Sequence, residues 1–366
     1  MEFVSSSFFK WRLVGSLFLL LALAACQGEE IPLTRFENSP IVDSLLASAP
    51  HFVVNTDTEP ERWAATTRLG LPNDSLILGR PSSMIAIGDT IYISDRQSEN
   101  IFAVGADGYL SRKIGQQGQG PGEFNNLVRG LQYSGSHVFV QEMGRVHLFT
   151  ETFEYVDSFF SLDYFLRRFS VSPDYVFLQC PGDPLESTWM VCARSTSPPH
   201  EWIPDIELLP RLDLPNQSGE NGNVVTVTPD GDRIAMSYMR LPYIFIYDDQ
   251  FRHLQTIRFE GEQIRDFHPS GFPDEVQIPA GEESFTRHFI RTMKFINSRY
   301  LVAVAPVLKN YVIDLSENDY TVARKTIFRT INDTKDIAAY DFFLHGDHLY
   351  VSSIWEEYVY GYEFEL

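Results

Sequence analysis

Residues 114–149 read IGQQGQGPGEFNNLVRGLQYSGSHVFVQEMGRVHLF. The first half holds five glycines between Gly115 and Gly130, and the second half holds short apolar runs that meet polar turns. The glycines fit no phosphate-binding template, because Gly120 precedes proline where a P-loop needs lysine and no helix follows. The segment is therefore predicted to connect two β-rich units, with glycine permitting unusual backbone dihedrals and Phe124 packing between the units.

The second half of this stretch belongs to a unit that occurs six times. In each unit an apolar run meets a tight polar turn and continues into a strand rich in β-branched or aromatic residues. The turns lie at Gly88-Asp89, Gly135, Pro173-Asp174, Asp230-Gly231, Asn297-Ser298 and Gly346-Asp347. A further strand follows in each unit, and a fourth closes several of them. This repeat predicts an all-β fold, a six-bladed β-propeller with four-stranded antiparallel blades.

The two ends of the repeat array are expected to meet. A β-sandwich or an irregular barrel is the alternative, but a sandwich does not repeat a four-stranded unit six times. The last unit ends at Leu366 after its third strand, and residues 62–71, RWAATTRLGL, have strand composition. Because an open ring would expose strand edges that invite aggregation, this N-terminal strand is predicted to complete the last blade.

The glycine-rich connection and the strands after it resemble an NHL-type repeat. That family has Gly-x-Gly-Pro-Gly-x-Phe, then a strand, a turn and a strand that ends in aspartate. Residues 78–149 match best, with Asp95 at the aspartate position and Glu142 in its place in the second unit. The whole region resembles the TolB-like six-bladed propellers of Bacteroidetes-type lipoproteins. Most of those proteins have no assigned function, so the resemblance implies little about chemistry.

The N-terminus carries a targeting segment. Lys10 and Arg12 precede thirteen uncharged residues, Leu13–Ala25. A helix that spans a bilayer needs about 20 apolar residues, so this shorter run fits a secretory signal instead. The run ends in LAAC, which resembles the lipobox of bacterial lipoproteins, and in that family the chain is cut before the cysteine and Cys26 is acylated. Two or more acyl chains give stable anchoring. The alternative is an ordinary signal peptide with a chance cysteine after it.

This resemblance also implies a domain plan and a location. Residues 1–25 are expected to be the signal peptide, residues 26–60 a lipidated and partly ordered tether, and residues 61–366 the propeller. No aspartate directly follows Cys26, which argues against retention in the inner membrane, and Glu29 and Glu30 resemble the surface-export signal of Bacteroidetes-type lipoproteins. The expected location is the outer membrane, with the propeller in the periplasm or on the cell surface.

Charge and cysteine content restrict the partners further. The formal net charge is −20 at pH 7, and loss of Glu2, Lys10 and Arg12 with the signal peptide changes it to −21. Nucleic acid is excluded as a partner, because binding its phosphate backbone needs a basic stripe. Cys180 and Cys192 flank a turn-rich segment, and a cross-strand disulfide between them is expected in an oxidising compartment, with two buried free thiols as the alternative.

Propeller geometry predicts which loops face a ligand. The loops between second and third strands share one face with the blade connections, and the longest connections are residues 205–222 and 262–284. Long loops on a rigid scaffold commonly carry binding residues; the alternative is that they only cover the edge of the core. The candidates on this face are Arg96, Glu142, Arg145, Tyr238, Arg240, Lys309, Trp355 and Glu356, together with Gln116, Gln117 and Glu123 of the glycine-rich connection.

The chemistry of these candidates favours binding over catalysis. Cations among aromatic residues suit a polar or anionic organic ligand. The sequence contains no Gly-x-Ser-x-Gly or His-Glu-x-x-His motif, so no catalytic residue, metal ligand or cofactor is predicted. Asp95 and Glu142 would belong to the metal site of a propeller lactonase-type enzyme, which leaves calcium or zinc open, although paired carboxylates in repeats more often bond turn amides.

Three functions therefore remain. The first is a binding module for a glycan, a peptide or a partner protein. The second is a metal-dependent hydrolase or lyase that works at the channel mouth, and the third is a scaffold within an envelope complex. The lack of a catalytic motif favours the first and the third.

Overall fold

The computed structural model describes residues that belong to one compact unit, Phe36–Leu366. The described ranges are 40–70, 78–105, 107–125, 127–142, 144–160, 169–179, 189–197, 200–210, 222–239, 241–261, 289–305, 309–316, 321–353 and 355–365.

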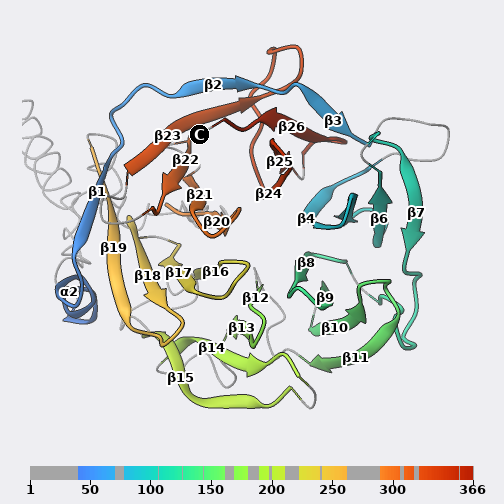
Figure 1. Ribbon diagram of the computed structural model, residues 1–366, viewed down its shortest axis with the longest axis horizontal. Coiled ribbons are helices and arrows are strands. Elements are labelled where there is room, and N and C mark those ends of the chain that lie inside the picture. Colours follow the sequence, from blue (N-terminus) through green and yellow to red (C-terminus); the bar gives the residue numbers. More distant parts are fainter. Residues whose placement is uncertain are drawn as a thin grey trace, which may run out of the picture. The chain divides into compact units, whose positions relative to one another are not determined.

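Six sheets, each with four antiparallel strands, form the blades of a ring, so the predicted six-bladed β-propeller is confirmed (Figure 1). The first strand of each blade faces the centre, where it lies beside the first strands of the neighbouring blades. Blade 1 consists of β4 (Pro81–Ile87), β5 (Thr90–Asp95), β6 (Asn100–Val104) and β7 (Leu110–Ile114). Blade 2 consists of β8 (Gly130–Tyr133), β9 (His137–Glu142), β10 (Arg145–Thr150) and β11 (Tyr155–Phe160). Blade 3 consists of β12 (Ser170–Val171), β13 (Tyr175–Gln179), β14 (Trp189–Ser195) and β15 (Trp202–Pro210). Blade 4 consists of β16 (Asn223–Val227), β17 (Arg233–Tyr238), β18 (Tyr243–Asp248) and β19 (His253–Glu260). Blade 5 consists of β20 (Thr292–Phe295), β21 (Tyr300–Ala305), β22 (Lys309–Asp314) and β23 (Thr321–Arg329).

Blade 6 joins the two ends of the chain. It consists of β24 (Asp341–His345), β25 (His348–Ser352), β26 (Val359–Glu363) and the N-terminal strand β3 (Thr67–Leu69). Strands β26 and β3 are antiparallel, with Gly361 opposite Thr67. A Cβ atom on Gly361 would lie 2.4 Å from the Thr67 methyl group, so glycine allows the two strands to approach. The predicted closing of the ring is thus confirmed, by residues 67–69 of the predicted stretch 62–71.

Part of the segment expected to be a tether folds onto the ring. Helix α2 (Pro40–Ala47) and strands β1 (His51–Asn55) and β2 (Glu61–Ala64) precede β3. Strand β1 pairs in parallel with β19 and β2 with β23, so blades 4 and 5 each gain a fifth strand. The buried Lys325 amine donates to the carbonyl oxygens of Thr56 (2.5 Å) and Thr58 (2.7 Å) between these strands. The folded part therefore begins well before residue 61.

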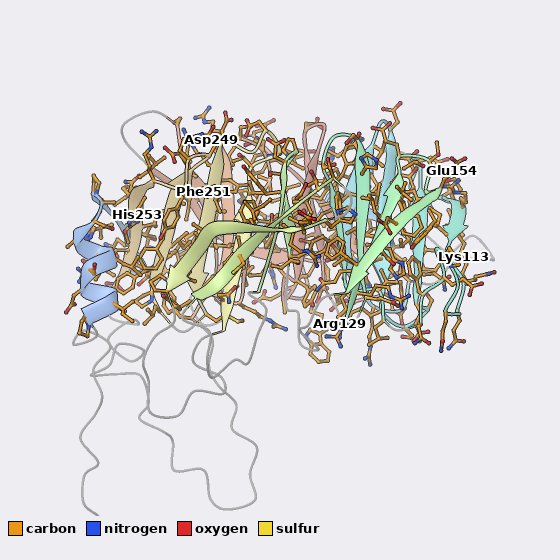
Figure 2. The ribbon with its side chains drawn as sticks, turned by 90° about the horizontal axis from the view of Figure 1, so that it is seen from below. Lys113, Arg129, Glu154, Asp249, Phe251 and His253 are labelled. Carbon is orange, nitrogen blue, oxygen red and sulfur yellow. The ribbon has the colours of Figure 1, made fainter. Side chains whose placement is uncertain are left out.

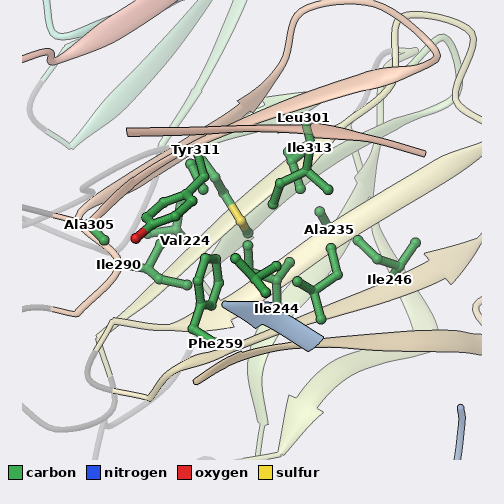
Figure 3. Close-up of a cluster of buried hydrophobic side chains, with 14 of the residues drawn as sticks. Val224, Ala235, Ile244, Ile246, Phe259, Ile290, Leu301, Ala305, Tyr311 and Ile313 are labelled. Atoms are coloured by element: carbon green, nitrogen blue, oxygen red, sulfur yellow. The ribbon is translucent and has the colours of Figure 1, made fainter. Parts of the chain in front are cut away.

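The core lies between the blades. Hydrophobic clusters occur at all six junctions between neighbouring blades among the described residues, and each draws side chains from both sheets. At the junction of blades 4 and 5, Ile244 and Phe259 pack with Leu301 and Tyr311 (Figure 3). Because each sheet is covered on both faces, the middle strands are almost continuously apolar, and burial of each large side chain stabilises the fold by about 1.5–3 kcal/mol.

The ring has two different faces. The turn face holds the tight turns between first and second strands and between third and fourth strands, and the loop face holds the other loops and the blade connections. Figure 2 shows Asp249 and Glu154, from turns between third and fourth strands, on the side opposite Arg129, which immediately precedes β8. Within the described ranges, no helix has the length and hydrophobicity needed to cross a membrane.

Candidate ligand face and central channel

The glycine-rich connection is a blade junction, as predicted. Gly115 has a φ angle of +87°, and a Cβ atom there would lie 2.3 Å from the Phe124 ring. Phe124 is fully buried in a cluster that includes Ile101 of blade 1 and Leu131 of blade 2. The side chains of Gln116 and Glu123 bond to each other within the connection (2.6 Å), and bonds from the Gly120 amide and Gln116 lower the pKa of Glu123.

The two carboxylates at the NHL-type position hold backbone amides. Asp95 is buried and accepts hydrogen bonds from the amides of Gly79 (2.6 Å), Arg80 (3.1 Å), Gln97 (2.8 Å) and Ser98 (2.9 Å). These contacts tie the entry of blade 1 to its loop between the second and third strands. The Asp95 carboxylate therefore has a structural role.

Glu142 has the same task in blade 2, which corrects its assignment to the ligand face. Only 2 % of Glu142 is exposed, and its carboxylate accepts hydrogen bonds from the Asn125 amide (2.8 Å) and approaches the buried His147 Nε2 (3.1 Å). Among the described residues, His, Cys, Asp and Glu side chains form no group of three that could hold a metal ion.

Tyr238 is also wrong as a ligand contact, because its side chain is fully buried. It belongs to the cluster between blades 3 and 4, packs edge-on against Phe245 and donates its hydroxyl to the Pro210 carbonyl. Burial raises the pKa of the Tyr238 phenol well above its ordinary value. The last residue of β17 faces the neighbouring blade rather than the loop face.

The other ligand-face candidates come from several blades. Arg96 of blade 1 is half-buried, Arg145 of blade 2 lies 3.9 Å from Glu142, and Lys309 of blade 5 is exposed with a φ angle of +85°. In blade 6, Trp355 is 68 % exposed, and Glu356 bonds Lys335 (2.5 Å). Arg240 and most of the two long connections lie outside the described residues.

A small cavity occupies the centre of the ring. The volume that the centres of water molecules can reach in this cavity is about 30 Å³, which is room for about two waters. All six blades contribute to its wall, which consists of Ser82, Ser83, Arg129, Gly130, Gln132, Gln141, Phe169, Ser170, Val225, Thr226, Met293, Lys294, Tyr340 and Asp341. Most of these residues stand at or near the start of a first strand, at the end of the channel that belongs to the loop face.

Polar side chains in the channel link one blade to the next. Asp341 Oδ2 of blade 6 accepts from the Met84 amide (2.9 Å) and Ser83 Oγ (3.1 Å) of blade 1, and from Lys294 Nζ (3.1 Å) of blade 5. Ser170 Oγ accepts from the Val227 amide at 3.0 Å, which joins blades 3 and 4. These bonds use much of the polar lining to hold the ring together.

The mouth of the channel is cationic. Arg129 lines the cavity on the loop face, with its backbone amide bonded to the Gln141 carbonyl (2.8 Å). Partial burial, and next the positive charge of Arg96, lower the pKa of the Arg129 guanidinium. Tyr340 stands at the same mouth, with its amide bonded to the Ser352 carbonyl (2.8 Å).

Sequence patterns did not predict Arg129, Lys294, Tyr340 and Asp341, which line the cavity. A signal was present, because Lys294 and Asp341 are charges within otherwise apolar first strands, TMKF and DFFLH. Charged residues in a strand that faces the ring centre are rare unless they are paired. The direction in which they point follows only from the closed ring.

Cys192 is disulfide-bonded. It lies in β14 opposite Leu178 of β13. Cys180, its expected partner, lies outside the described residues, so the pairing of Cys180 with Cys192 stays a prediction.

The comparison with protein families agrees with this topology. The model of family DUF5128, described as a 6-bladed beta-propeller, matches residues 72–129, which comprise blade 1 and the glycine-rich connection. The fold is a six-bladed β-propeller. None of the curated proteins matches this chain.

Solved structures with a similar fold come from several organisms. They include a Bacteroides fragilis protein that is proposed to be exported, the hydrazine synthase of Kuenenia stuttgartiensis and the Cps50 β-propeller domain of Myceliophteria thermophila. In that order, the identities are 13, 14 and 9 % and the TM-scores are 0.47, 0.46 and 0.46. The matches cover 82, 77 and 78 % of this chain and 87, 83 and 98 % of the other chains. At these values they carry no argument about activity or location.

Proposed function

We propose that this protein is a lipid-anchored outer-membrane protein whose β-propeller binds a glycan, a peptide or a partner protein on its loop face. The cationic channel mouth at the centre of that face carries the proposal. In a chain with a net charge of −20, Arg129 lines this mouth, and partial burial and then the positive charge of Arg96 lower the pKa of its guanidinium. Such a local reversal of sign favours recognition of a polar or anionic ligand.

The roles of the buried carboxylates favour binding over hydrolysis. Asp95 and Glu142 hold backbone amides, and Asp341 accepts hydrogen bonds from donors of two other blades. A general base needs a lone pair directed at the substrate. These carboxylates instead direct oxygens at the protein's own amides and at Lys294.

An exposed indole provides a test of the proposed face. Trp355 is 68 % exposed on the loop face, whereas Tyr109, in the turn between β6 and β7, is 46 % exposed on the turn face. Trp355→Ala is expected to weaken binding of the mature protein to its ligand on glycan and peptide arrays by at least about tenfold, because aromatic anchors dominate binding energy. Tyr109→Ala is the matched control and should leave the array signal unchanged. A loss in Tyr109→Ala with binding retained in Trp355→Ala would place the ligand on the other face.

The proposed anchor rests on Cys26, which lies outside the described residues. Replacing Cys26 by alanine removes the thiol to which the proposed lipid would attach, so the variant is expected to move from the membrane pellet to the soluble fraction. Fractionation of cells that express wild type or Cys26→Ala measures this shift. Gln27→Ala, at the next position, keeps the thiol of Cys26 and is the matched control, which should stay in the pellet. Retention of Cys26→Ala in the pellet would remove the lipoprotein assignment.

A further inference from the structure

We propose that the turn face of blade 6 carries a site for a divalent transition-metal ion such as zinc, with His345, His348 and Glu363 as its ligands. The three residues stand at the turn-face ends of β24, β25 and β26 (Figure 1). The proposed function places its ligand on the opposite face of the ring. The metal site is therefore independent of that proposal, and the two can fail separately.

The strand register of blade 6 places the three side chains in one row. His345 is directly opposite His348 across the hairpin, and His348 is directly opposite Glu363 on its other side. Side chains of opposite residues project from the same face of a sheet, with Cβ atoms about 4.5–5.5 Å apart. Two imidazoles at this separation can both reach one zinc ion, whose bonds to nitrogen are about 2.0–2.1 Å long.

The backbone under the row is fixed. Gly346 has a φ angle of +59°, the conformation that a two-residue hairpin turn with glycine at its first position requires. The Phe364 amide bonds the Asp347 carbonyl (2.8 Å), which holds the end of β26 against the hairpin. The Cα positions of the three proposed ligands are therefore set before a metal ion binds.

Each imidazole stacks on an aromatic ring of its own strand. The ring centres of His345 and Phe343 lie 5.9 Å apart with an interplanar angle of 21°, and those of His348 and Tyr350 lie 6.1 Å apart with an angle of 30°. Phe343 and Tyr350 are themselves opposite each other and pack in the cluster between blades 6 and 1. This aromatic base keeps both imidazoles side by side at the rim of the turn face.

Asp347 sets the tautomer that a metal ligand needs. His348 Nδ1 lies 2.6 Å from Asp347 Oδ1, and because a carboxylate only accepts, Nδ1 donates the proton. The neutral imidazole then carries its free lone pair on Nε2, the atom that would bind the metal ion. A carboxylate bonded to the other ring nitrogen is the usual partner of a metal-binding histidine, since it orients the ring and raises the basicity of the ligand nitrogen.

The donor set selects the class of ion. Imidazole nitrogen suits zinc, copper and nickel ions, whereas calcium and magnesium ions prefer oxygen, and two histidines with one glutamate form a known zinc ligand set. In their present rotamers the three side chains form no metal-binding group. His345 and His348 are half-buried and Glu363 is exposed, so their side chains can rotate toward a shared ion, and water completes its coordination.

Zinc titration of the mature protein without a histidine tag tests the site. After removal of metal with EDTA, zinc chloride is titrated in a calorimeter, and one zinc ion is expected to bind per chain. Because the ion would join β24, β25 and β26 only in the folded state, the midpoint of thermal unfolding should rise by about 3 °C or more at zinc about a hundredfold above its Kd. Calcium chloride is the comparison ion and should produce neither effect.

Variants assign the bound ion to the row. His345→Gln and His348→Gln are each expected to weaken zinc binding by about tenfold or more, because each removes one of the two imidazoles, and Glu363→Gln should weaken it less. His137→Gln is the matched control. His137 also begins the second strand of its blade on the turn face, but its partner on β10 is Thr150, which is no such ligand. Thermal melting in EDTA establishes that each variant is folded.

Two results would overturn the site. One is a wild type whose calorimetric trace and thermal midpoint do not change with zinc, and the other is zinc binding of unchanged affinity in the folded double variant His345→Gln/His348→Gln. Zinc binding that needs both histidines but is unchanged in Glu363→Gln supports the imidazole pair and removes Glu363 as a ligand. Each of these results leaves the proposed function standing, because array binding tests the opposite face.

Discussion

Asp341→Ala is expected to lower the free energy of unfolding by about 3–5 kcal/mol, because it removes one partner of a largely buried ion pair. Asp341 Oδ2 receives donors from the Met84 amide, Ser83 Oγ and Lys294 Nζ, which belong to blades 1 and 5. The side chains of Lys294 and Asp341 are 15 % and 5 % exposed. The variant therefore leaves an ammonium group without its countercharge in the channel, and the change is measured by urea unfolding.

A double variant separates the buried charge from the loss of packing. Lys294→Met with Asp341→Leu removes both charges and keeps apolar volume, so it is expected to be more stable than Asp341→Ala alone. Asp341→Asn keeps an acceptor for the Met84 amide and should lie between Asp341→Ala and wild type. If Asp341→Ala changes stability by less than about 1 kcal/mol, the pair does not contribute to closing the ring.

Phe124→Ala is the second substitution with a large expected effect, a loss of about 3–5 kcal/mol. Phe124 is fully buried between blades 1 and 2 and packs edge-on against Phe149 and His147. The cavity left by its ring cannot collapse easily, because the backbone on both sides is held. The Gly118 amide bonds the Phe124 carbonyl (3.0 Å), and the Phe124 amide bonds the Gln116 carbonyl (2.9 Å).

The control for this substitution is Tyr109→Ala, which truncates a half-exposed ring outside the core. Its stability is expected to change by no more than about 0.5 kcal/mol in the same urea titration. A loss that is equal in the two variants would mean that the glycine-rich connection does not lock the junction. Phe124→Leu should keep most of the packing and lose about 1–2 kcal/mol.

Several features could be predicted from local patterns. The six blades follow from a repeated order of apolar run, turn and strand, since turn residues and strand composition act over a few residues. The closing role of residues 62–71 follows from a count of strands, and the burial of Phe124 follows from an aromatic residue that closes a glycine-rich crossing. The lipid on Cys26 and the pairing of Cys180 with Cys192 stay predictions.

Other features required the position of distant residues. Tyr238 and Glu142 are the last residues of strands that end near the loop face, but each side chain points to a neighbouring segment that the repeat does not specify. Strands β1 and β2 lie outside the repeated four-stranded unit, so the spacing of the repeat does not predict them. They pair with the ring through their backbone edges. The buried Val54 of β1, and Lys325 of β23, which bonds the Thr56 carbonyl, add side-chain contacts.

The sequence by itself determined the number of blades, the order of their strands, the junction at the glycine-rich connection and the strand that closes the ring, because these depend on spacing along one chain. Only the tertiary structure decided which charges meet. The Asp341 carboxylate, the Lys294 amine and the backbone of Met84 come from three blades. Coulomb energy depends on distance in space and on removal from water. Neither quantity exists until six sheets close around one axis.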